Sequence, residues 1–560
     1  MTHIKRALAL TLAVLLALGG VSLASGDARA AQSVTKADRT VALPAGGSRS
    51  VTALEIDLSD PAIRVFSMHA PGGVGATASL KDIAAQLDGQ SYEVIAAING
   101  TFFDAYVQGK QVAVGTVVSN GEMIHKYDKA LIGFGLDNSV ALGRVKIRCI
   151  GWTGGVKDSA HSFYIHNWNR LLPATTSYNE AVLTPAFGPR TGATDMNVLV
   201  VRDDVITAVT KGDTAIPADG FAYVYPDNSP YNDGRFKVGA SFEYERTYYD
   251  WNDKPIDWSA MHNITGVGPT LVLDGIKTAN AAAEGWDDPK LTQSAGARSF
   301  IGYDESGTKL VLGTAASCTI SQMGDLALAY GLKDAMNLDG GASSGLLFEG
   351  SYLTTPGRLL SNAIVVVRVK QDIMSQWARA DIARGVSLRF IPADLQSAYT
   401  ADVTRAEYCR TLVQMLQRVT LMGKNEMMTH FGVTAAKGRF PDVTSHQEAI
   451  LTANALGIVN GDSVGNFNPN GSITRAQAAV MLANVAKRFG IAVSNLRTAS
   501  FADAQDIPSW AQESIGQVAA LGLMQGGSDG RFNPDGPLTR EQCFAVVLRL
   551  SRRIPQLSAK

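Results

Sequence analysis

The octapeptide at residues 337–344, Asn-Leu-Asp-Gly-Gly-Ala-Ser-Ser, sets one carboxylate among two glycines, two serines and an asparagine. Upstream, residues 325–333 have the apolar spacing of a helix, with Ser321 as its predicted N-cap and Gly331 placed to end it. Because glycine lacks a Cβ, Gly340 and Gly341 let a ligand approach the backbone, and the nearby N–H and hydroxyl groups supply donors. The octapeptide therefore predicts an anion or sugar site, with a tight turn that satisfies only its own backbone as the alternative.

Size and charge limit the broad class of the protein. A chain of 560 residues exceeds one hydrophobic core and predicts about two to four domains. Its 50 Lys and Arg residues balance 51 Asp and Glu residues, for a formal net charge of -1. No overall field would draw the protein to nucleic acid, so its partners must be argued from particular sites.

The N-terminus has the pattern of an export signal. Lys5 and Arg6 precede an uncharged apolar run over residues 7–24, and Ala28-Arg29-Ala30 offers a small-x-small cleavage pattern. Residues 1–30 are predicted to be a signal peptide, with an uncleaved membrane anchor as the alternative. No later segment is apolar enough to span a membrane, so we expect no transmembrane segment after signal cleavage.

Cysteine usage argues against a metal site and a disulfide scaffold. The four cysteines form no Cys-x-x-Cys pair and have no histidine at ligand spacing, and the histidines do not cluster. Cys409 and Cys543 lie in apolar helical patterns, where we expect buried free thiols. No metal and no cofactor are predicted.

Residues 33–369 contain mainly short strand-like runs separated by Gly, Asp and Asn, with a few helices. Examples are residues 93–98, 197–202, 270–273, 309–312 and 363–369. The regular strand–helix alternation of a doubly wound sheet is missing, so we predict a mixed, strand-rich α+β domain. Several runs end in polar turns, at residues 99–104, 266–269 and 297–302, in addition to the octapeptide.

Together these turns resemble the phosphodiester glycosidase family, which includes the enzyme that uncovers mannose 6-phosphate by removing N-acetylglucosamine from a phosphodiester. The motifs are Asn99-Gly100-x-Phe102-Phe103, Gly268-Pro269, Arg298 and the octapeptide, and the resemblance covers roughly residues 50–370. Residues 104–179, with an aromatic segment at 163–169, match no part of the family pattern; we expect an insertion that shapes a pocket wall.

Cleavage of a sugar-1-phosphodiester needs a carboxylate near the anomeric carbon and a cation or N–H donors on the phosphate. Asp339 suits the first role and Arg298 the second, because its guanidinium can bind phosphate oxygens in a bidentate way. The alternatives are a structural ion pair for Arg298 and a core position for Phe102 and Phe103; Asp104 and Glu122 are candidates for a second carboxylate. The predicted catalytic residues are Asp339, Arg298, Asn99 and Asn337, and the predicted substrate-binding residues are Gly100, Gly268, Gly340, Gly341, Ser343 and Ser344.

Beyond residue 371 the pattern becomes helical and repeats. Pro469 and Pro534 are 65 residues apart, and so are the Thr-Arg pairs that begin at Thr474 and Thr539. An earlier copy contains Trp377 and a Thr-Arg pair at residues 404–405. The three copies resemble S-layer homology repeats, and we place them at residues 374–430, 438–490 and 499–554.

The S-layer resemblance implies an all-α domain of three units packed around one axis, because a single unit cannot bury its apolar face. It also implies grooves for pyruvylated secondary cell-wall polysaccharide. The sequence departs from the pattern at three points: Ser445 stands where the other copies have Trp, Gln477 where the first has Glu407, and Arg389 at the expected glycine position of the first copy. The second groove is accordingly in doubt. Helix starts with solvated arginines are the alternative for the Thr-Arg pairs. The predicted polysaccharide-binding residues are Trp377, Arg405, Arg475, Trp510 and Arg540.

The combined expectation is a secreted glycosidase of the cell surface that hydrolyses a sugar-1-phosphodiester of the N-acetylglucosamine-1-phosphodiester kind and is held non-covalently on the cell wall. The alternatives are a non-catalytic glycan- or phosphoglycan-binding protein and a structural protein of the surface layer. Residues 31–370, the glycosidase domain, and residues 374–560 are expected to fold separately.

Overall fold

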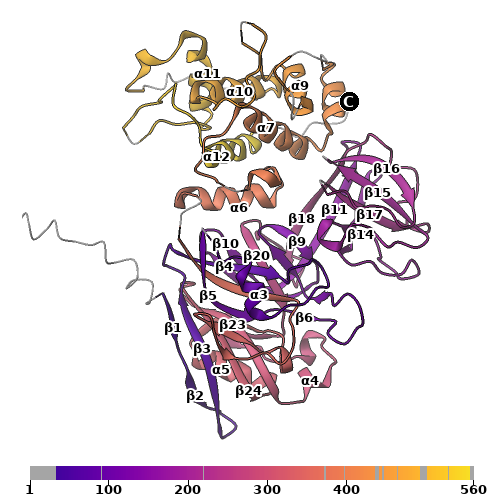
Figure 1. Cartoon of the computed structure of the whole chain (residues 1–560), viewed down its shortest axis with the longest axis vertical. Coiled ribbons are helices and arrows are strands. Elements are labelled where there is room, and N and C mark those ends of the chain that lie inside the picture. Colours follow the sequence, from indigo (N-terminus) through magenta and orange to yellow (C-terminus); the bar gives the residue numbers. More distant parts are fainter. Residues whose placement is uncertain are drawn as a thin grey trace, which may run out of the picture.

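The computed structural model describes residues 33–89, 91–202, 204–218, 220–370, 374–396, 398–435, 440–443, 447–462, 464–491, 501–527 and 529–554. The predicted signal peptide and the residues 371–373 at the predicted domain boundary lie outside this set. Figure 1 shows a strand-rich main body, a smaller strand-rich lobe beside it and a helical body at the opposite end. Among the described residues, no helix combines the length and apolar character needed to cross a membrane.

Three antiparallel sheets build the main body. The first has the order β1 (Val34–Lys36), β3 (Ser48–Asp57), β24 (Lys309–Cys318), β23 (Gly296–Asp304), β25 (Leu332–Asn337), β21 (Thr270–Leu273), β22 (Ile276–Lys277), with β2 (Arg39–Ala42) beside β3. The second has the order β27 (Ser351–Thr354), β26 (Leu346–Phe348), β5 (Tyr92–Asn99), β28 (Asn362–Val369), β4 (Ile63–His69). The third has the order β19 (Pro255–Ile256), β18 (Phe242–Asp250), β11 (Val140–Thr153), β10 (Lys129–Gly135), β20 (Met261–Val267), β8 (Val117–Ser119), β9 (Glu122–His125), with β12 (Ser162–Tyr164) beside β11. A two-stranded ribbon pairs β6 (Phe102–Phe103) with β7 (Ala113–Val114).

The apolar strand pattern explains how the sheets pack. In β28, Ile364 and Val366 enter the core shared by the three sheets, whereas Val365 packs on the other face with Leu80 and Ile83 of α3 (Leu80–Ala85). Both faces of β28 are buried, which is why its sequence is a continuous apolar run. The strands expected near residues 93, 197, 270, 309 and 363 are all present, which confirms the strand-rich prediction for this region.

One helix begins earlier than the sequence suggested. It is α5 (Ile320–Ala329), which packs on the first sheet, and its N-cap is Thr319 with Gln322 completing a capping box, in place of the predicted Ser321. Thr319, two residues upstream of the predicted cap, accepts a hydrogen bond from the Gln322 N–H, so the helix begins at Ile320, five residues before the predicted start at residue 325. Gly331 follows the helix with a positive φ of 70°, as a terminating glycine does.

A separate lobe stands on two long strands of the third sheet. The far halves of β11 and β18 leave the main body and carry a five-stranded sheet with the order β13 (Asn167–Trp168), β14 (Ala181–Leu183), β17 (Gly220–Pro226), β15 (Met196–Arg202), β16 (Val205–Lys211). We call residues 153–242 the outer lobe. The insertion expected over residues 104–179 is thus divided, because residues 117–135 supply strands of the main body and only its later part enters the lobe.

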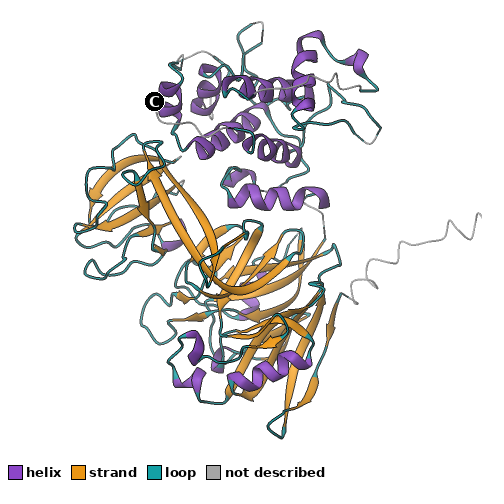
Figure 2. Cartoon of the chain, turned by 180° about the vertical axis from the view of Figure 1, so that it is seen from behind, coloured by secondary structure: helices purple, strands orange, loops and turns teal. Residues whose placement is uncertain are grey.

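The helical body contains α6 (Arg379–Ser387), α7 (Arg405–Thr420), α8 (Lys424–His430), α9 (Gln447–Ala455), α10 (Arg475–Arg488), α11 (Ser509–Ala520) and α12 (Arg540–Ser551). Figure 2 shows these helices gathered at one end of the molecule, with the helix nearest the strands lying against the main body. Thr404, Thr474 and Thr539 each cap the second helix of a repeat through a capping box. Isolated β-bridges join the repeats in a closed triangle and one core runs through all three, as expected for units around a shared axis; the bridges are Asp402–Thr539, Thr404–Ser472 and Thr474–Pro537.

The helical body contacts both other bodies. Helix α6 packs on β20 and β10, and Leu136 of the main body joins the helical core. Arg418 of α7 forms ion pairs with Asp204 and Glu243 of the outer lobe and its edge, with a distance of 2.5 Å to Glu243. All three side chains are exposed by less than a tenth, so the arginine bridges two buried carboxylates across the contact.

Candidate active site

Two strand ends from different sheets meet at the octapeptide. Asn99 is the last residue of β5 and Asn337 the last of β25. The Asn99 amide donates to the Asp339 carbonyl at 2.7 Å, and its oxygen accepts from Ser299 Oγ at 2.7 Å and from the Gly345 N–H at 3.0 Å. Asn99 therefore braces the Asp339 turn against two other strands, a positioning role that differs from the predicted contact with substrate.

The Asp339 carboxyl is largely enclosed. Its Oδ1 accepts from the Gly340 N–H at 2.8 Å. Burial raises the pKa of Asp339 to about 6, although the Ser343 hydroxyl, the Gly340 amide and the charges of Arg358 and Arg298 act in the opposite direction. A carboxyl with this pKa changes its protonation state close to neutral pH, which suits acid–base or electrostatic catalysis.

Two buried polar atoms of the octapeptide have no hydrogen-bond partner among the described residues. They are Asn337 Oδ1 and Ser344 Oγ, on side chains that are at most 4% exposed, whereas the Ser343 hydroxyl interacts with the Asp339 carboxyl. A buried polar group without a partner costs about 1–3 kcal/mol, so two in one turn call for an explanation beyond folding. A hydroxyl-rich ligand could supply both missing partners, because a hydroxyl donates as well as accepts.

Glycines keep the turn compact at two points. A Cβ on Gly100 would lie 1.9 Å from Asn362 Oδ1, the atom that accepts the Thr101 N–H. Gly341 has φ +61°, which starts the short 3-10 helix Gly341–Ser343. The other two predicted glycines also lie at the site: the Gly268 carbonyl accepts from Asn337 Nδ2 at 3.4 Å, and a Cβ on Gly340 would lie 2.8 Å from the Ala297 carbonyl.

Arg298 occupies the predicted place but not the predicted geometry. Its side chain is buried in β23, where Nε donates to the Cys318 carbonyl at 3.2 Å and one terminal nitrogen donates to the carbonyls of Ser294 and Lys290. Only the other terminal nitrogen faces the site, 3.3 Å from where a Cβ on Gly340 would stand. The guanidinium cannot hold phosphate oxygens with two parallel donors here, because most of its donors bind the backbone.

Sequence reasoning missed a second group of cations beside Asp339. Arg358 lies in the loop between β27 and β28, and this loop is tied to the octapeptide by a 2.7 Å hydrogen bond from Gly357 N–H to the Ala342 carbonyl. Arg358 donates to the Tyr106 hydroxyl at 3.0 Å, and Lys290 lies 5.5 Å from the Tyr106 ring centre. The hydrogen bond and charge of Arg358 lower the pKa of Tyr106. No motif signals these residues, because two separate loops and the short helix α4 (Pro289–Thr292) bring them together.

The other sequence candidates lie in different surroundings. Glu122 is the exposed first residue of β9, with Arg246 as a charged neighbour. The backbone N–H of Asp104 donates to the Val112 carbonyl in a turn. Phe102 packs against two cores and lies 5.5 Å from the Trp286 ring, in keeping with a core position. In the part of the chain that is described, no cluster of three or more His, Cys, Asp or Glu side chains could hold a metal ion, and all four cysteines are buried free thiols.

The predicted polysaccharide-binding arginines of the helical repeats lie in two kinds of environment. Arg405 Nε donates to the Phe467 carbonyl at 2.8 Å and its guanidinium lies 4.8 Å from that ring; Arg475 makes the same pair of contacts with Phe532, at 2.6 and 4.8 Å. Arg540 instead forms a 2.6 Å ion pair with Glu407. The two predicted tryptophans are exposed, Trp377 by 53% and Trp510 by 59%, while Ser445 lies outside the described residues.

Comparison with known families supports both halves of the chain. Residues 195–367 match the model of the phosphodiester glycosidase family, and residues 439–479 and 500–542 match the S-layer homology domain. The glycosidase match begins at residue 195, so the resemblance of residues 50–194 stays a prediction from motifs. A hypothetical protein from Synechocystis shares the fold, with a TM-score of 0.51, 24% identity and coverage of 60% of this chain and 62% of that one.

Curated relatives are similar over shorter segments. An amylopullulanase of Thermoanaerobacterium thermosulfurigenes is 29% identical over 186 residues, which are 32% of this chain and 9% of that protein. The S-layer protein sap of Bacillus anthracis is 34% identical over 119 residues, 21% of this chain and 14% of that protein. The chain thus spans only a small part of the curated relatives it matches.

S-layer homology domains attach proteins to the cell surface without a covalent bond. With the Asp339 turn, the triangle of capped helices and the two family matches taken together, this chain carries a phosphodiester glycosidase domain followed by S-layer homology repeats.

Proposed function

We propose that the main body hydrolyses a sugar-1-phosphodiester, of the N-acetylglucosamine-1-phosphodiester kind, at the surface of the cell. The observation that carries the proposal is the enclosed Asp339 carboxyl, whose pKa burial raises to about 6, beside two buried polar atoms that have no partner among the described residues. A sugar ring presents several hydroxyls, which can donate to Asn337 Oδ1 and bond Ser344 Oγ.

In the reaction, a water oxygen bonds to the anomeric carbon while the bond from that carbon to the phosphate oxygen breaks. The phosphate monoester leaves with the electron pair of the broken bond, and it is stable as an anion, so it needs little help from a general acid. The ionised Asp339 carboxylate stabilises the positive charge that develops on the sugar or takes the proton from the attacking water. Asn99 holds the turn in place through its bond to the Asp339 carbonyl.

The phosphate contact is assigned mainly to Arg358. Its guanidinium is partly exposed and reaches the neighbourhood of Asp339, whereas most donors of Arg298 are bound to carbonyls. Arg298 contributes its charge and its one remaining nitrogen. Lys290 and Tyr106 complete a polar rim on the same side.

The helical body is proposed to hold the enzyme on cell-wall polysaccharide, with pyruvylated polymers as the specific ligand. Arg405 and Arg475 are the carboxylate contacts in two equivalent grooves, and Trp377 and Trp510 are exposed for stacking on sugar rings.

The test is hydrolysis of a methyl phosphodiester of N-acetylglucosamine-1-phosphate by the full chain, measured as released sugar and phosphomonoester. Asp339→Asn should fold and bind but lose roughly two to four orders of magnitude in turnover. Asp334→Asn is the matched control, since this other aspartate near the end of β25 binds the Asp274 N–H and the Tyr303 hydroxyl. Its turnover per folded molecule should stay near that of the wild type.

A second substrate that carries no phosphate, an aryl glycoside, separates the role of Arg358 from that of Asp339. Arg358→Ala should weaken kcat/KM for the phosphodiester by roughly one to two orders of magnitude and leave an aryl glycoside nearly unchanged. Full turnover by Asp339→Asn would contradict the catalytic assignment. Tight binding of the phosphodiester with no hydrolysis by the wild type would favour the alternative, a surface protein that only binds phosphoglycans.

A further inference from the structure

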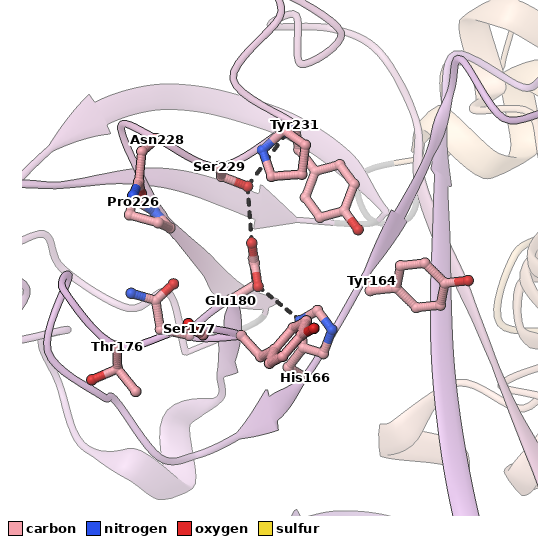
Figure 3. A pocket seen from close by; sticks show the side chains of 12 residues that line it. Tyr164, His166, Thr176, Ser177, Glu180, Pro226, Asn228, Ser229 and Tyr231 are labelled. Atoms are coloured by element: carbon pink, nitrogen blue, oxygen red, sulfur yellow. Dashed lines mark hydrogen bonds and ion pairs between the residues drawn. The ribbon is translucent and has the colours of Figure 1, made fainter.

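The outer lobe contains a pocket of about 510 Å³ that none of the residues around Asp339 lines. Three stretches form it: residues 164–166, the loop at 176–180 before β14, and residues 226–231 after β17. Its volume lies in the range of small-molecule sites. Figure 3 shows the Glu180 carboxylate between Ser229 and His166, with the rings of Tyr231 and Tyr164 to one side of it.

A fixed carboxylate lies in the pocket. Glu180 is only 5% exposed and accepts from His166 Nδ1 at 2.7 Å and from Ser229 Oγ at 2.9 Å. Burial is the largest single influence on its pKa and opposes ionisation, but the hydrogen bonds from His166, the backbone and Ser229 together outweigh burial and lower the pKa. None of the twelve lining residues is Lys or Arg. A phosphate or carboxylate ligand would therefore meet the Glu180 carboxylate and no Lys or Arg side chain in the lining.

Aromatic side chains form the rim of the pocket, and their exposure and backbone conformation are unusual for residues that serve only the fold. Tyr178 is 73% exposed and has φ +57°, a left-handed conformation that few residues other than glycine adopt without strain. Tyr164 is 47% exposed. The His166 ring lies between them, with centroid distances of 5.8 Å to Tyr164 and 4.9 Å to Tyr178. Exposed rings on strained backbone contribute little to folding, so a ligand is the better reason for their arrangement.

We propose that this pocket is a second carbohydrate site, specific for uncharged sugars. The ring faces of Tyr178 and Tyr164 can cover the apolar CH face of a sugar, while Glu180 and neighbouring amides such as Asn179 and Asn228 bond its hydroxyls. The site differs in charge from the cation-lined Asp339 region and from the arginine grooves of the repeats. The site would bind a neutral segment of a glycan on the outer lobe. This binding does not depend on hydrolysis at Asp339.

The experiment is calorimetric titration of the full chain with the neutral disaccharides cellobiose, maltose and chitobiose, and with digalacturonic acid as the anionic probe. At least one neutral sugar should bind with a dissociation constant of about 1 mM, and the anionic sugar should not. Tyr178→Ala should weaken binding at least roughly tenfold, and Glu180→Gln by a similar factor. Trp251→Ala is the control, because this partly exposed ring lies outside the pocket, and it should bind as the wild type does.

Tyr178→Ala separates the two sites, because it should lose the neutral sugar while its phosphodiester turnover stays near that of the wild type. Parallel loss of sugar binding and of turnover in this variant would place the sugar at the octapeptide and overturn the inference. It would also be overturned if no neutral sugar bound at about 10 mM, if digalacturonic acid bound equally, or if Tyr178→Ala kept full affinity. Because Tyr178 is exposed, its removal should not lower the unfolding temperature, so loss of affinity cannot be ascribed to misfolding.

Discussion

Several polar groups of the octapeptide lower the stability of the fold. The enclosed Asp339 carboxyl resists ionisation, and two neighbouring polar atoms, Asn337 Oδ1 and Ser344 Oγ, have no partner among the described residues. Arg298 shows the opposite balance, since its hydrogen bonds to backbone carbonyls fasten β23 to its surroundings and leave one nitrogen for the site. We therefore expect Arg298→Lys to destabilise the fold and to impair phosphodiester and aryl glycoside substrates alike, in contrast to Arg358→Ala.

The pKa of Asp339 predicts how both activity and stability depend on pH. Activity needs the carboxylate, so kcat/KM should rise through an inflection near pH 6. The folded-state pKa of about 6 lies above the unfolded value of about 3.9, so the folded protein binds this proton more tightly. Relative to Asp339→Asn, the wild type should thus lose about 1–2 kcal/mol of stability as pH rises from 4 through 6. A pH-independent difference in the free energies of unfolding would contradict the burial of this carboxyl.

At the scale of elements, each repeat is built from a Thr-capped helix that places one arginine beside the turn of another repeat. Gln477 forms the same capping box with Thr474 that Glu407 forms with Thr404, so this departure from the sequence pattern does not impair the second repeat. The surroundings of Arg405 and Arg475 are alike, whereas the charge of Arg540 is balanced by Glu407. The doubt about the second groove therefore rests on Ser445 alone.

The surroundings of each arginine predict how much that arginine contributes to binding of purified cell walls. Arg405→Ala and Arg475→Ala should each weaken sedimentation with walls by roughly tenfold, and Arg540→Ala should do so by less, because its charge is already paired. Arg488→Ala is a control at the far end of α10, where the side chain binds the Leu456 carbonyl. Equal retention of all variants, or equal binding to walls stripped of anionic polysaccharide, would contradict the assignment.

At the scale of the whole molecule, the first repeat contacts the outer lobe as well as the other two repeats. Arg389 stands where the other repeats have Gly457 and Gly522, and it adopts the same left-handed conformation, with φ 58° against 74° and 70°. It forms a 2.8 Å ion pair with Asp204 of the outer lobe and lies 4.0 Å from the Tyr244 ring. The strain at Arg389 is thus offset by a contact between bodies.

This contact predicts coupled unfolding of the enzyme and the first repeat, although the sequence pattern suggested separate folding. Arg418→Ala would leave Glu243 buried without its partner and Asp204 with Arg389 alone, at a cost of about 3–5 kcal/mol. In scanning calorimetry, we expect the main transition of the wild type to split into two in this variant. Arg410→Ala is the control on the same helix, because Arg410 pairs with Asp394 inside the helical body. Two separate transitions already present in the wild type would show that the bodies are independent.

Local patterns were sufficient to predict the strands, the capped helices of the repeats and the Asp339 turn. Period-two and helical spacing, glycines and Thr-x-x-Gln or Thr-x-x-Glu boxes act over a few residues, so they can be read from the chain. Only the tertiary structure could show that Arg358, Tyr106 and Lys290 meet, that the donors of Arg298 bind the backbone, and that Arg389 serves an interface. Each of these depends on segments tens to hundreds of residues apart whose proximity is decided by sheet packing, and no local spacing encodes that proximity.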